Sequence, residues 1–212
     1  MAVTLAAPIH EIELAPGSAI RLKEVSWQAY LALLQTLGED RGARVAYSDR
    51  VLEIRMPGQL HESVNRVLTA VISTLAEGLD RDFNNLGSAT LNRPDLVKGI
   101  EPDSCFYIYS AEAGQGMALP TDLPPDLAIE VNIASSSQQK LEIYAAMGVL
   151  ELWLYRQGEL RIMGLQDGQY GELSRSVAFP EVSVAQLNEW LALREQGTDL
   201  TVMRAVRGAI AP

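Results

Sequence analysis

The sequence contains one cysteine and no long apolar run, and each shortage excludes a class of protein. Cys105 is alone among 212 residues, so the chain forms no internal disulfide and no zinc site built on cysteine pairs. We expect it to be a small core residue in a strand. Apolar runs stay below the roughly 18 residues that span a bilayer, and the N-terminus lacks the basic start and apolar core of a signal peptide. We therefore expect a cytoplasmic protein with no membrane segment.

Histidine and positive charge are also scarce. The chain has only two histidines, His10 and His61, so there are few candidates for the histidine of a Ser-His-acid triad. The net charge of −10 and the pI of about 4.7 have the wrong sign for a protein that coats nucleic acid nonspecifically. Acids gathered at a metal site contribute to that charge, however, and a local basic patch could still face phosphates. Such a patch could draw on Arg44, Arg50, Arg55, Arg66 and Arg93.

Length and composition indicate one folded domain. The chain is 48% hydrophobic and 21% charged, and it has no Gly/Ser-rich or Pro-rich linker. A chain of this length supports one well-buried core and is short for two full domains. We expect a single domain over 1–212, with a core from about 24 to 195, a helical extension over about 198–210 and a loose first stretch of roughly 15 residues.

Periodicity and capping residues predict an α/β fold in which a mixed β-sheet is flanked by helices. The helices are expected at 27–37 (between Ser26 and Gly38), from His61 to Leu79, from the Ser135–Ser137 run to Gly148, at 184–196 after Ser183, and at 199–210. Strands are expected at 43–48 and 51–56 as a hairpin around Asp49 and Arg50, and at 83–91, 100–109, 126–133, 151–156, 159–165 and 169–174, with a loop from Ala111 to Pro125.

Three charged residues lie in short consecutive segments. Asp103 is in GIEPDSCFYI, Glu130 is in the apolar strand DLAIEVNI, and Lys140 falls in the first turn of the next helix. Groups in these positions could meet at one end of a sheet. Carboxylates hold Mg²⁺, which supplies an attacking water, neutralises phosphate charge and helps the leaving oxygen. The pattern predicts a metal-dependent phosphodiesterase with Asp103 and Glu130 as ligands, aided by the Ile129 or Val131 carbonyl, and with Lys140 orienting water or stabilising negative charge.

Each candidate also has a plainer interpretation. Asp103 could end a turn, and Lys140 could be a solvated lysine. Glu62 would be stabilised by the dipole of the helix that begins near it, although it could also act at the metal directly or through water. His61 beside it could be a general base, but a surface or capping histidine is the commoner case. Glu130 is different, because an unpaired carboxylate in an apolar strand is costly; it must point outward, pair with a cation or bind a metal.

Four strings together resemble a known family: VSWQAYLALLQTLG, AYSDRVLEIRMPGQLHE, GIEPDSCFYI and PPDLAIEVNIASSSQQKLEIYAAMGVLELWLY. They look like the Uma-type restriction endonucleases, a domain-of-unknown-function family within the PD-(D/E)XK nuclease superfamily. The similarity runs from about 24 to 207. The resemblance implies a restriction-endonuclease-like core, dependence on Mg²⁺ for which Mn²⁺ can substitute, and a phosphodiester substrate, expected to be DNA.

The resemblance maps the family's helix acid onto Glu62, its PD acid onto Asp103, its second strand acid onto Glu130 and its lysine onto Lys140. These three acids are thereby the expected metal ligands. The superfamily's usual lysine lies two residues after the strand acid, where this chain has the neutral Asn132; close relatives often have an aspartate there. Such departures could weaken or abolish cleavage. The alternative is therefore a catalytically silent nuclease-like domain that serves as a nucleic-acid or protein interaction module.

A homodimer is expected, because a double-strand cut needs two sites and such enzymes often pair by two-fold symmetry. The sequence does not indicate which surface would pair. No motif that reads bases stands out, so neither the choice between DNA and RNA nor a recognition sequence follows from the sequence.

Overall fold

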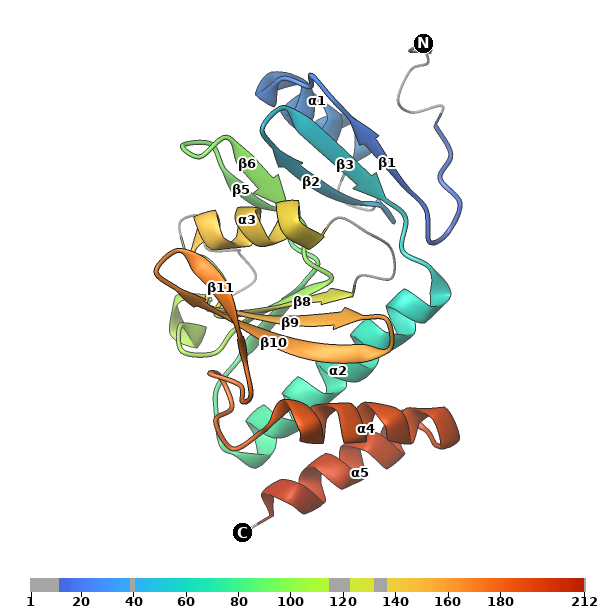
Figure 1. Cartoon of the computed structure of the whole chain (residues 1–212), viewed down its shortest axis with the longest axis vertical. Coiled ribbons are helices and arrows are strands. Elements are labelled where there is room, and N and C mark those ends of the chain that lie inside the picture. Colours follow the sequence, from blue (N-terminus) through green and yellow to red (C-terminus); the bar gives the residue numbers. More distant parts are fainter. Residues whose placement is uncertain (1–11, 39–40, 115–122, 132–136, 212) are drawn as a thin grey trace.

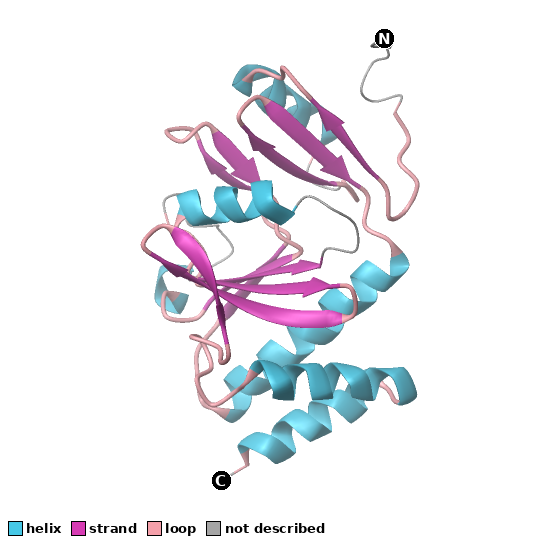
Figure 2. Ribbon diagram, viewed as in Figure 1, coloured by secondary structure: helices cyan, strands magenta, loops and turns pink. Residues whose placement is uncertain are grey.

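The computed structural model describes residues 12–38, 41–114, 123–131 and 137–211, and in these it forms two β-sheets and five α-helices. Figure 1 shows the sheets one above the other, with α3 (Ser137–Met147) between them. On the opposite side of the lower sheet lie α2 (Gln59–Gly78) and α4 (Val184–Gln196), and α5 (Asp199–Ile210) packs against these two helices (Figure 2). The predicted α/β class is confirmed.

The first sheet is antiparallel and carries α1 (Trp27–Leu37). Ser26 caps this helix, because its hydroxyl accepts a hydrogen bond from the Ala29 amide at 3.1 Å, as predicted. The tight turn at Asp49 and Arg50 has positive φ angles of 51° and 62°, typical of a hairpin turn. In spatial order the strands are β1 (Ala19–Leu22), β3 (Val51–Arg55), β2 (Arg44–Ser48), β6 (Lys98–Ile100) and β5 (Leu91–Arg93).

The second sheet is mixed, since β8 and β9 are parallel and every other neighbouring pair is antiparallel. The chain passes from β8 to β9 through α3, which makes a βαβ unit. In spatial order the strands are β11 (Gln169–Leu173), β10 (Glu159–Gln166), β9 (Glu151–Arg156), β8 (Leu127–Val131), β7 (Ser104–Tyr107) and β4 (Asn84–Gly87).

The largest core lies between the second sheet and α2. The helix contributes apolar side chains at steps of three and four residues, and β8 contributes Leu127, Ile129 and Val131. Val202 and Val206 of α5 are fully buried in the same core, so the C-terminal helix packs as part of it. Buried Cys105 in β7 belongs to a smaller cluster that joins α3 to both sheets, which confirms its predicted position.

Two strand predictions are wrong in the same way. The runs 83–91 and 100–109 each divide between the two sheets: β4 and β7 lie in the second, whereas β5 and β6 lie in the first. Pro102 has no amide hydrogen to continue a ladder, and Gly87 has a φ of 59°, so the runs break there. Residue 103 therefore stands where the chain leaves one sheet and enters the other. Strand β1, which we did not predict, adds an edge to the first sheet.

No helix in the described part of the chain is long and apolar enough to cross a membrane. The predictions that concern Asn132, Ser135, Ser136 and the loop over 115–122 fall outside the described residues.

Candidate active site

Alternation in two strands brings charged side chains face to face. On β3, Leu52 and Ile54 point into the core beneath α1, so Glu53 and Arg55 point the other way. On β8, the apolar residues at 127, 129 and 131 face α2, so Glu130 points toward α3. The charged residues of the two sheets thus face the same interior space between the sheets.

Asp103 is fixed at the head of β7. Its amide donates to the Ile129 carbonyl at 3.0 Å, and its Oδ2 accepts from the Val131 amide at 2.6 Å. The Asn65 side chain of α2 donates to the Asp103 carbonyl at 3.1 Å. His61 Nε2 lies 3.0 Å from Oδ2. Asp103 is only 3% exposed, so these contacts hold its carboxylate in one orientation inside the protein.

Glu130 is held by two residues of α3. Lys140 and Tyr144 lie four positions apart, which places them on the same face of the helix. Lys140 Nζ donates to Glu130 Oε1, and the Tyr144 hydroxyl donates to Oε2 at 3.0 Å. Glu130 and Lys140 are 2% and 6% exposed. Glu130 therefore satisfies the requirement of a buried carboxylate by pairing, and Lys140 is an interior lysine rather than a solvated one.

Arg55 joins the two acids. Its Nη2 lies 2.9 Å from Asp103 Oδ1 and 3.4 Å from Glu130 Oε1, and its Nη1 donates to the Val131 carbonyl at 2.9 Å. Nη1 also contacts His61 Nε2. We call Arg55, His61, Asp103, Glu130 and Lys140 the charged cluster. It contains Asp103, Glu130 and Lys140, which the sequence suggested would meet.

Burial and charge shape the ionisation of the cluster. Burial raises the pKa of Asp103, but the hydrogen bond from His61 and the positive charge of Arg55 outweigh it, so the pKa lies below its usual value. Burial lowers the pKa of Arg55, and Glu130 and Asp103 raise it by more. Burial, and then the charge of Glu130, hold the pKa of Tyr144 well above its ordinary range. Asp103 and Arg55 are consequently charged, and the tyrosine remains a hydrogen-bond donor.

Glu53 extends the cluster on the side of the first sheet. Its Oε1 lies 3.7 Å from Lys140 Nζ, and its Oε2 lies 3.4 Å from Arg21 Nε on β1. Glu53 is 5% exposed. Lys140 therefore lies between the carboxylates of Glu130 and Glu53, one from each sheet.

Glu62 is not brought into the cluster. It is half-buried in the first turn of α2, and within the described residues its side chain makes no hydrogen bond or ion pair. It does line a pocket of about 380 Å³, which Asp103 also lines. A role for Glu62 at the acids thus requires a bridging water or a movement of its side chain.

That pocket continues into a second one. Arg44 and Ser88 line both, so the two pockets of about 380 and 310 Å³ adjoin each other on one side of the cluster. Arg66 of α2 lines the first pocket and Arg41 lines the second. The Nε atoms of Arg41 and Arg44 are buried and lack a partner among the described residues. We call the joined pockets the arginine groove; its other polar lining residues are Glu62, Asn65, Thr69, Asn85, Thr90, Glu101, Asp103 and Ser104.

A separate apolar pocket of about 350 Å³ lies between α2 and α4, lined in part by Val64, Val67 and Leu191. None of the charged-cluster residues lines it. Its lining suits an apolar group and not a phosphate.

Two members of the charged cluster lie where the sequence did not lead us to expect them. Arg55 was counted only as part of a surface patch, and His61 was expected at the surface or as a helix cap, yet His61 is 4% exposed and touches Asp103. The alternation of Leu52, Glu53, Ile54 and Arg55 was the signal for β3, because a strand with one apolar face must turn its charges to the other. The contact of His61 with Asp103 is evident only from the tertiary fold.

The oxygens around Arg55 fit a divalent cation. The Asp103 and Glu130 carboxylates and the Val131 carbonyl are hard oxygen donors, and all three already converge on one positive group. Within the described residues, no three His, Cys, Asp or Glu side chains form an all-protein cage. Two carboxylates and one carbonyl suit Mg²⁺, which usually keeps several waters.

Comparison with known proteins gives a family and a fold. The sequence model of the family described as "Uma2: Putative restriction endonuclease" matches residues 27–202. The chain also resembles a crystal structure of "a putative nuclease belonging to DUF820 from Anabaena variabilis ATCC 29413", with a TM-score of 0.56 and 18% identity over 79% of this chain and 99% of that one. At this identity the likeness establishes the fold alone. No curated protein matches the chain.

Proposed function

The chain belongs to the Uma2 family, described as putative restriction endonucleases, and we propose that it is a metal-dependent endonuclease that hydrolyses phosphodiester bonds in DNA. Its metal is Mg²⁺, with Mn²⁺ as a functional substitute. Asp103 and Glu130 bind the metal, and Lys140 acts beside them. Glu62 is an auxiliary acid that works through water.

One observation supports this proposal above the others. Oxygens from Asp103, Glu130 and Val131 surround one cationic position, and the ammonium of Lys140 contacts the same Glu130 oxygen that faces that position. Purely structural ion pairs need no such convergence of three oxygens. Phosphodiester hydrolysis needs both features, because negative charge on the phosphate must be neutralised while a water attacks.

A bound divalent cation would lower the pKa of a coordinated water and neutralise phosphate charge. The chain's own residues perform the rest. Lys140 holds its positive charge where negative charge develops on the phosphate, and Tyr144 and Lys140 together keep Glu130 oriented. His61 and the Val131 amide fix Asp103 Oδ2, which leaves Oδ1 to face the cationic position. Rigid support of this kind is what precise positioning of a reactive group requires.

The arginine groove supports a nucleic-acid strand as the substrate. It leads to Asp103, and Arg41, Arg44 and Arg66 line it. Guanidinium groups are well suited to phosphate oxygens. Arg41 is already paired with Glu101, so we expect Arg44 and Arg66 to make the phosphate contacts. The overall net charge of −10 means that the groove must act locally, so we expect modest affinity that falls quickly with salt.

The second candidate function is a catalytically silent nuclease-like domain that binds nucleic acid or protein. The observation that favours it is the charge balance of the cluster, in which Arg55 and Lys140 already neutralise two carboxylates. A domain of this kind would bind its partner without turnover in any divalent metal.

We further propose that the chain is one domain and that it pairs as a homodimer. Burial of Val202 and Val206 in the main core supports the first point. The need for two sites in a double-strand cut motivates the second. Light scattering of the purified protein gives its mass in solution directly, and a monomer mass across the working concentration range would reject the dimer.

The test of function is cleavage of several nucleic acids by the purified protein and one variant. Supercoiled plasmid, linear duplex, single-stranded DNA and RNA are incubated with Mg²⁺ or Mn²⁺, and Asp103→Asn is compared with the native protein. The proposal expects metal-dependent products that disappear in the variant. Asp95→Asn is the matched control, because Asp95 is exposed and pairs with nearby Arg93. Equal cleavage by native protein and Asp103→Asn would reject the assignment.

A further inference from the structure

Arg55 contacts each of the three oxygens that we assign to the metal. Nη2 reaches Asp103 Oδ1 at 2.9 Å and Glu130 Oε1 at 3.4 Å, while Nη1 reaches the Val131 carbonyl at 2.9 Å. The side chain is 13% exposed and comes from β3 in the first sheet, whereas its three partners belong to the second sheet or precede it directly. The guanidinium of Arg55 therefore occupies the position between the two sheets that we assign to the metal ion.

The contacts of Arg55 are not those of a fully satisfied structural ion pair. Its Nε is buried and has no partner among the described residues. Its Nη1 also points at His61 Nε2, the same atom that lies 3.0 Å from Asp103 Oδ2. A single imidazole nitrogen either accepts from Arg55 or donates to Asp103, and it cannot do both. Arg55 and Asp103 thus compete for the same His61 nitrogen.

A guanidinium and a divalent cation cannot share these oxygens. Mg²⁺ binds oxygen at about 2.0–2.1 Å, much closer than the hydrogen-bonded contacts seen here. A guanidinium left within a few ångströms of the ion would be repelled strongly in so buried a site. Metal entry consequently requires Arg55 to withdraw from Asp103 and Glu130.

We propose that Arg55 is an internal counter-ion, which holds the metal-binding oxygens of Asp103, Glu130 and Val131 together before metal arrives and is displaced when a divalent cation binds. The inference rests on the proposed metal site. Arg55 is a positioning residue in this account, since it acts through the two acids. Its withdrawal is an energetic cost that weakens metal binding, and it also removes the contact of Arg55 with His61 Nε2, which leaves that atom to Asp103.

The test is the affinity for Mn²⁺ alone, measured by calorimetry on the native protein, Arg55→Gln and Arg55→Lys. Loss of the positive charge in Arg55→Gln should tighten Mn²⁺ binding by about tenfold or more, because no cation has to be displaced. Arg55→Lys keeps the charge and should return the affinity to within about threefold of native. A residue with only a structural role would not produce this pattern.

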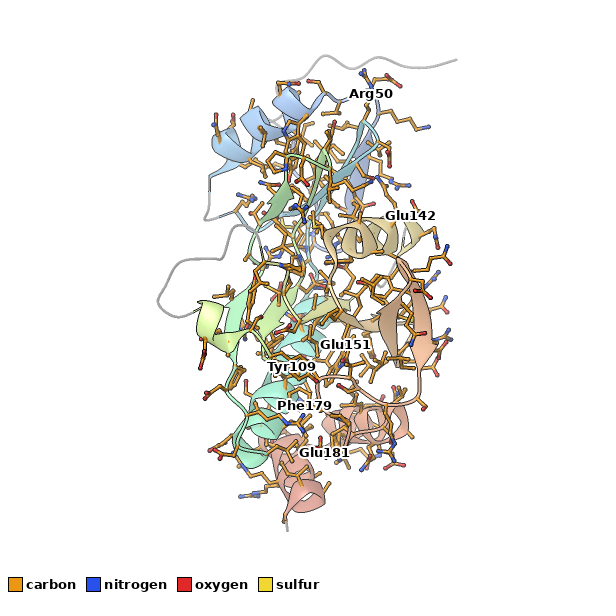
Figure 3. All side chains as sticks on the ribbon, turned by 90° about the vertical axis from the view of Figure 1, so that its left-hand side faces the viewer. Arg50, Tyr109, Glu142, Glu151, Phe179 and Glu181 are labelled. Carbon is orange, nitrogen blue, oxygen red and sulfur yellow. The ribbon has the colours of Figure 1, made fainter. Side chains whose placement is uncertain are left out.

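Arg50→Gln is the matched control, because it removes one arginine charge at a remote position. Arg50 lies in the turn between β2 and β3, is 62% exposed and pairs with Glu24, and Figure 3 shows it at the outer end of the first sheet. Its Mn²⁺ affinity should equal that of the native protein. A tenfold change in this control would indicate a general charge effect and overturn the proposal.

The remaining outcomes distinguish a failure of the Arg55 counter-ion proposal from a failure of the proposed metal site. Unchanged or weaker Mn²⁺ binding in Arg55→Gln, with native binding abolished by Asp103→Asn, overturns the counter-ion and leaves the metal site standing. Absence of Mn²⁺ binding in every protein overturns both. If Arg55→Gln unfolds without metal, its thermal midpoint in Mn²⁺ decides: the proposal requires a larger Mn²⁺-induced rise than in the native protein, and an equal or smaller rise overturns it.

Discussion

Lys140 Nζ donates to Glu130 Oε1 across a separation of ten residues, and both side chains are almost completely buried. The pair joins the end of β8 to the first turn of α3, so the βαβ crossover itself sets its geometry. An ammonium in this interior position is costly unless it is paired, and here Glu53 approaches it from the other sheet as well, at 3.7 Å. In the proposed mechanism, this same charge acts on the phosphate.

Lys140→Gln should lower the cleavage rate by at least about 100-fold, because a positive charge beside the developing negative charge is lost. Metal binding should be retained or slightly tighter, since a competing cation has been removed from Glu130. Single-turnover cleavage and Mn²⁺ calorimetry measure the two effects separately. Lys23→Gln, at an exposed position before α1, should behave like the native protein. Loss of metal binding in Lys140→Gln would mean that the lysine mainly supports the fold of the site.

Arg44→Gln and Arg66→Gln should each weaken nucleic-acid binding, because both side chains line the groove that leads to Asp103. Each removed phosphate contact should also reduce the slope of log K against log salt by about one unit. Fluorescence anisotropy with a labelled oligonucleotide over a salt series provides both quantities. Arg204→Gln, on the exposed side of α5, is the control. An unchanged slope in both groove variants would place the substrate elsewhere.

Glu62→Gln should reduce cleavage much less than Asp103→Asn does. Glu62 shares the pocket with Asp103 but makes no direct contact with the charged cluster, so only a water-mediated role is available to it in this geometry. Metal affinity should change by less than about threefold, in line with the modest effect of an indirect ligand. The comparison uses calorimetry and cleavage on the two variants side by side. Equal losses in both variants would make Glu62 a direct ligand and require the start of α2 to move.

Val202→Ala should lower the free energy of unfolding by about 2 kcal/mol, because it removes buried methyl groups from the core shared by α2, α5 and the second sheet. Leu200→Ala on the same helix should change it by less than about 0.5 kcal/mol, since Leu200 is 43% exposed. Denaturant unfolding followed by circular dichroism measures both. A single transition is expected. Separate loss of α5 in an earlier transition would contradict the one-domain proposal.

The sequence was sufficient to predict the helices and turns whose signals come from neighbouring residues. The cap at Ser26, the turn at Asp49 and Arg50, and the apolar period of α2 all follow from neighbouring residues, and the structure has each of them. Their physical causes act over a few positions, so no tertiary information is needed. The strand, helix and strand that form the βαβ unit were also expected, because their patterns are strong, whereas the parallel pairing of β8 with β9 was not predicted.

The division of the strands between two sheets could not be predicted in the same way. Whether β6 pairs with β2 or continues into β7 depends on contacts between distant residues, and the break at Pro102 shows only that a ladder is interrupted. The positions of Arg55 and His61 depend on that division, because they reach Asp103 only once the sheets are stacked. Asp103 and Glu130 could be selected as site residues from the sequence, whereas Arg55 and His61 could be placed beside them only from the fold.

The most direct test of the account is Mn²⁺ titration of the native protein and Asp103→Asn by calorimetry, with circular dichroism to confirm that both are folded. The asparagine keeps the shape of the side chain and one carbonyl oxygen for the Val131 amide, whereas the negative charge and the acceptor oxygen that faces Arg55 are lost. We expect saturable binding by the native protein and none by the variant. Identical isotherms would contradict the assignment of the charged cluster as the metal site.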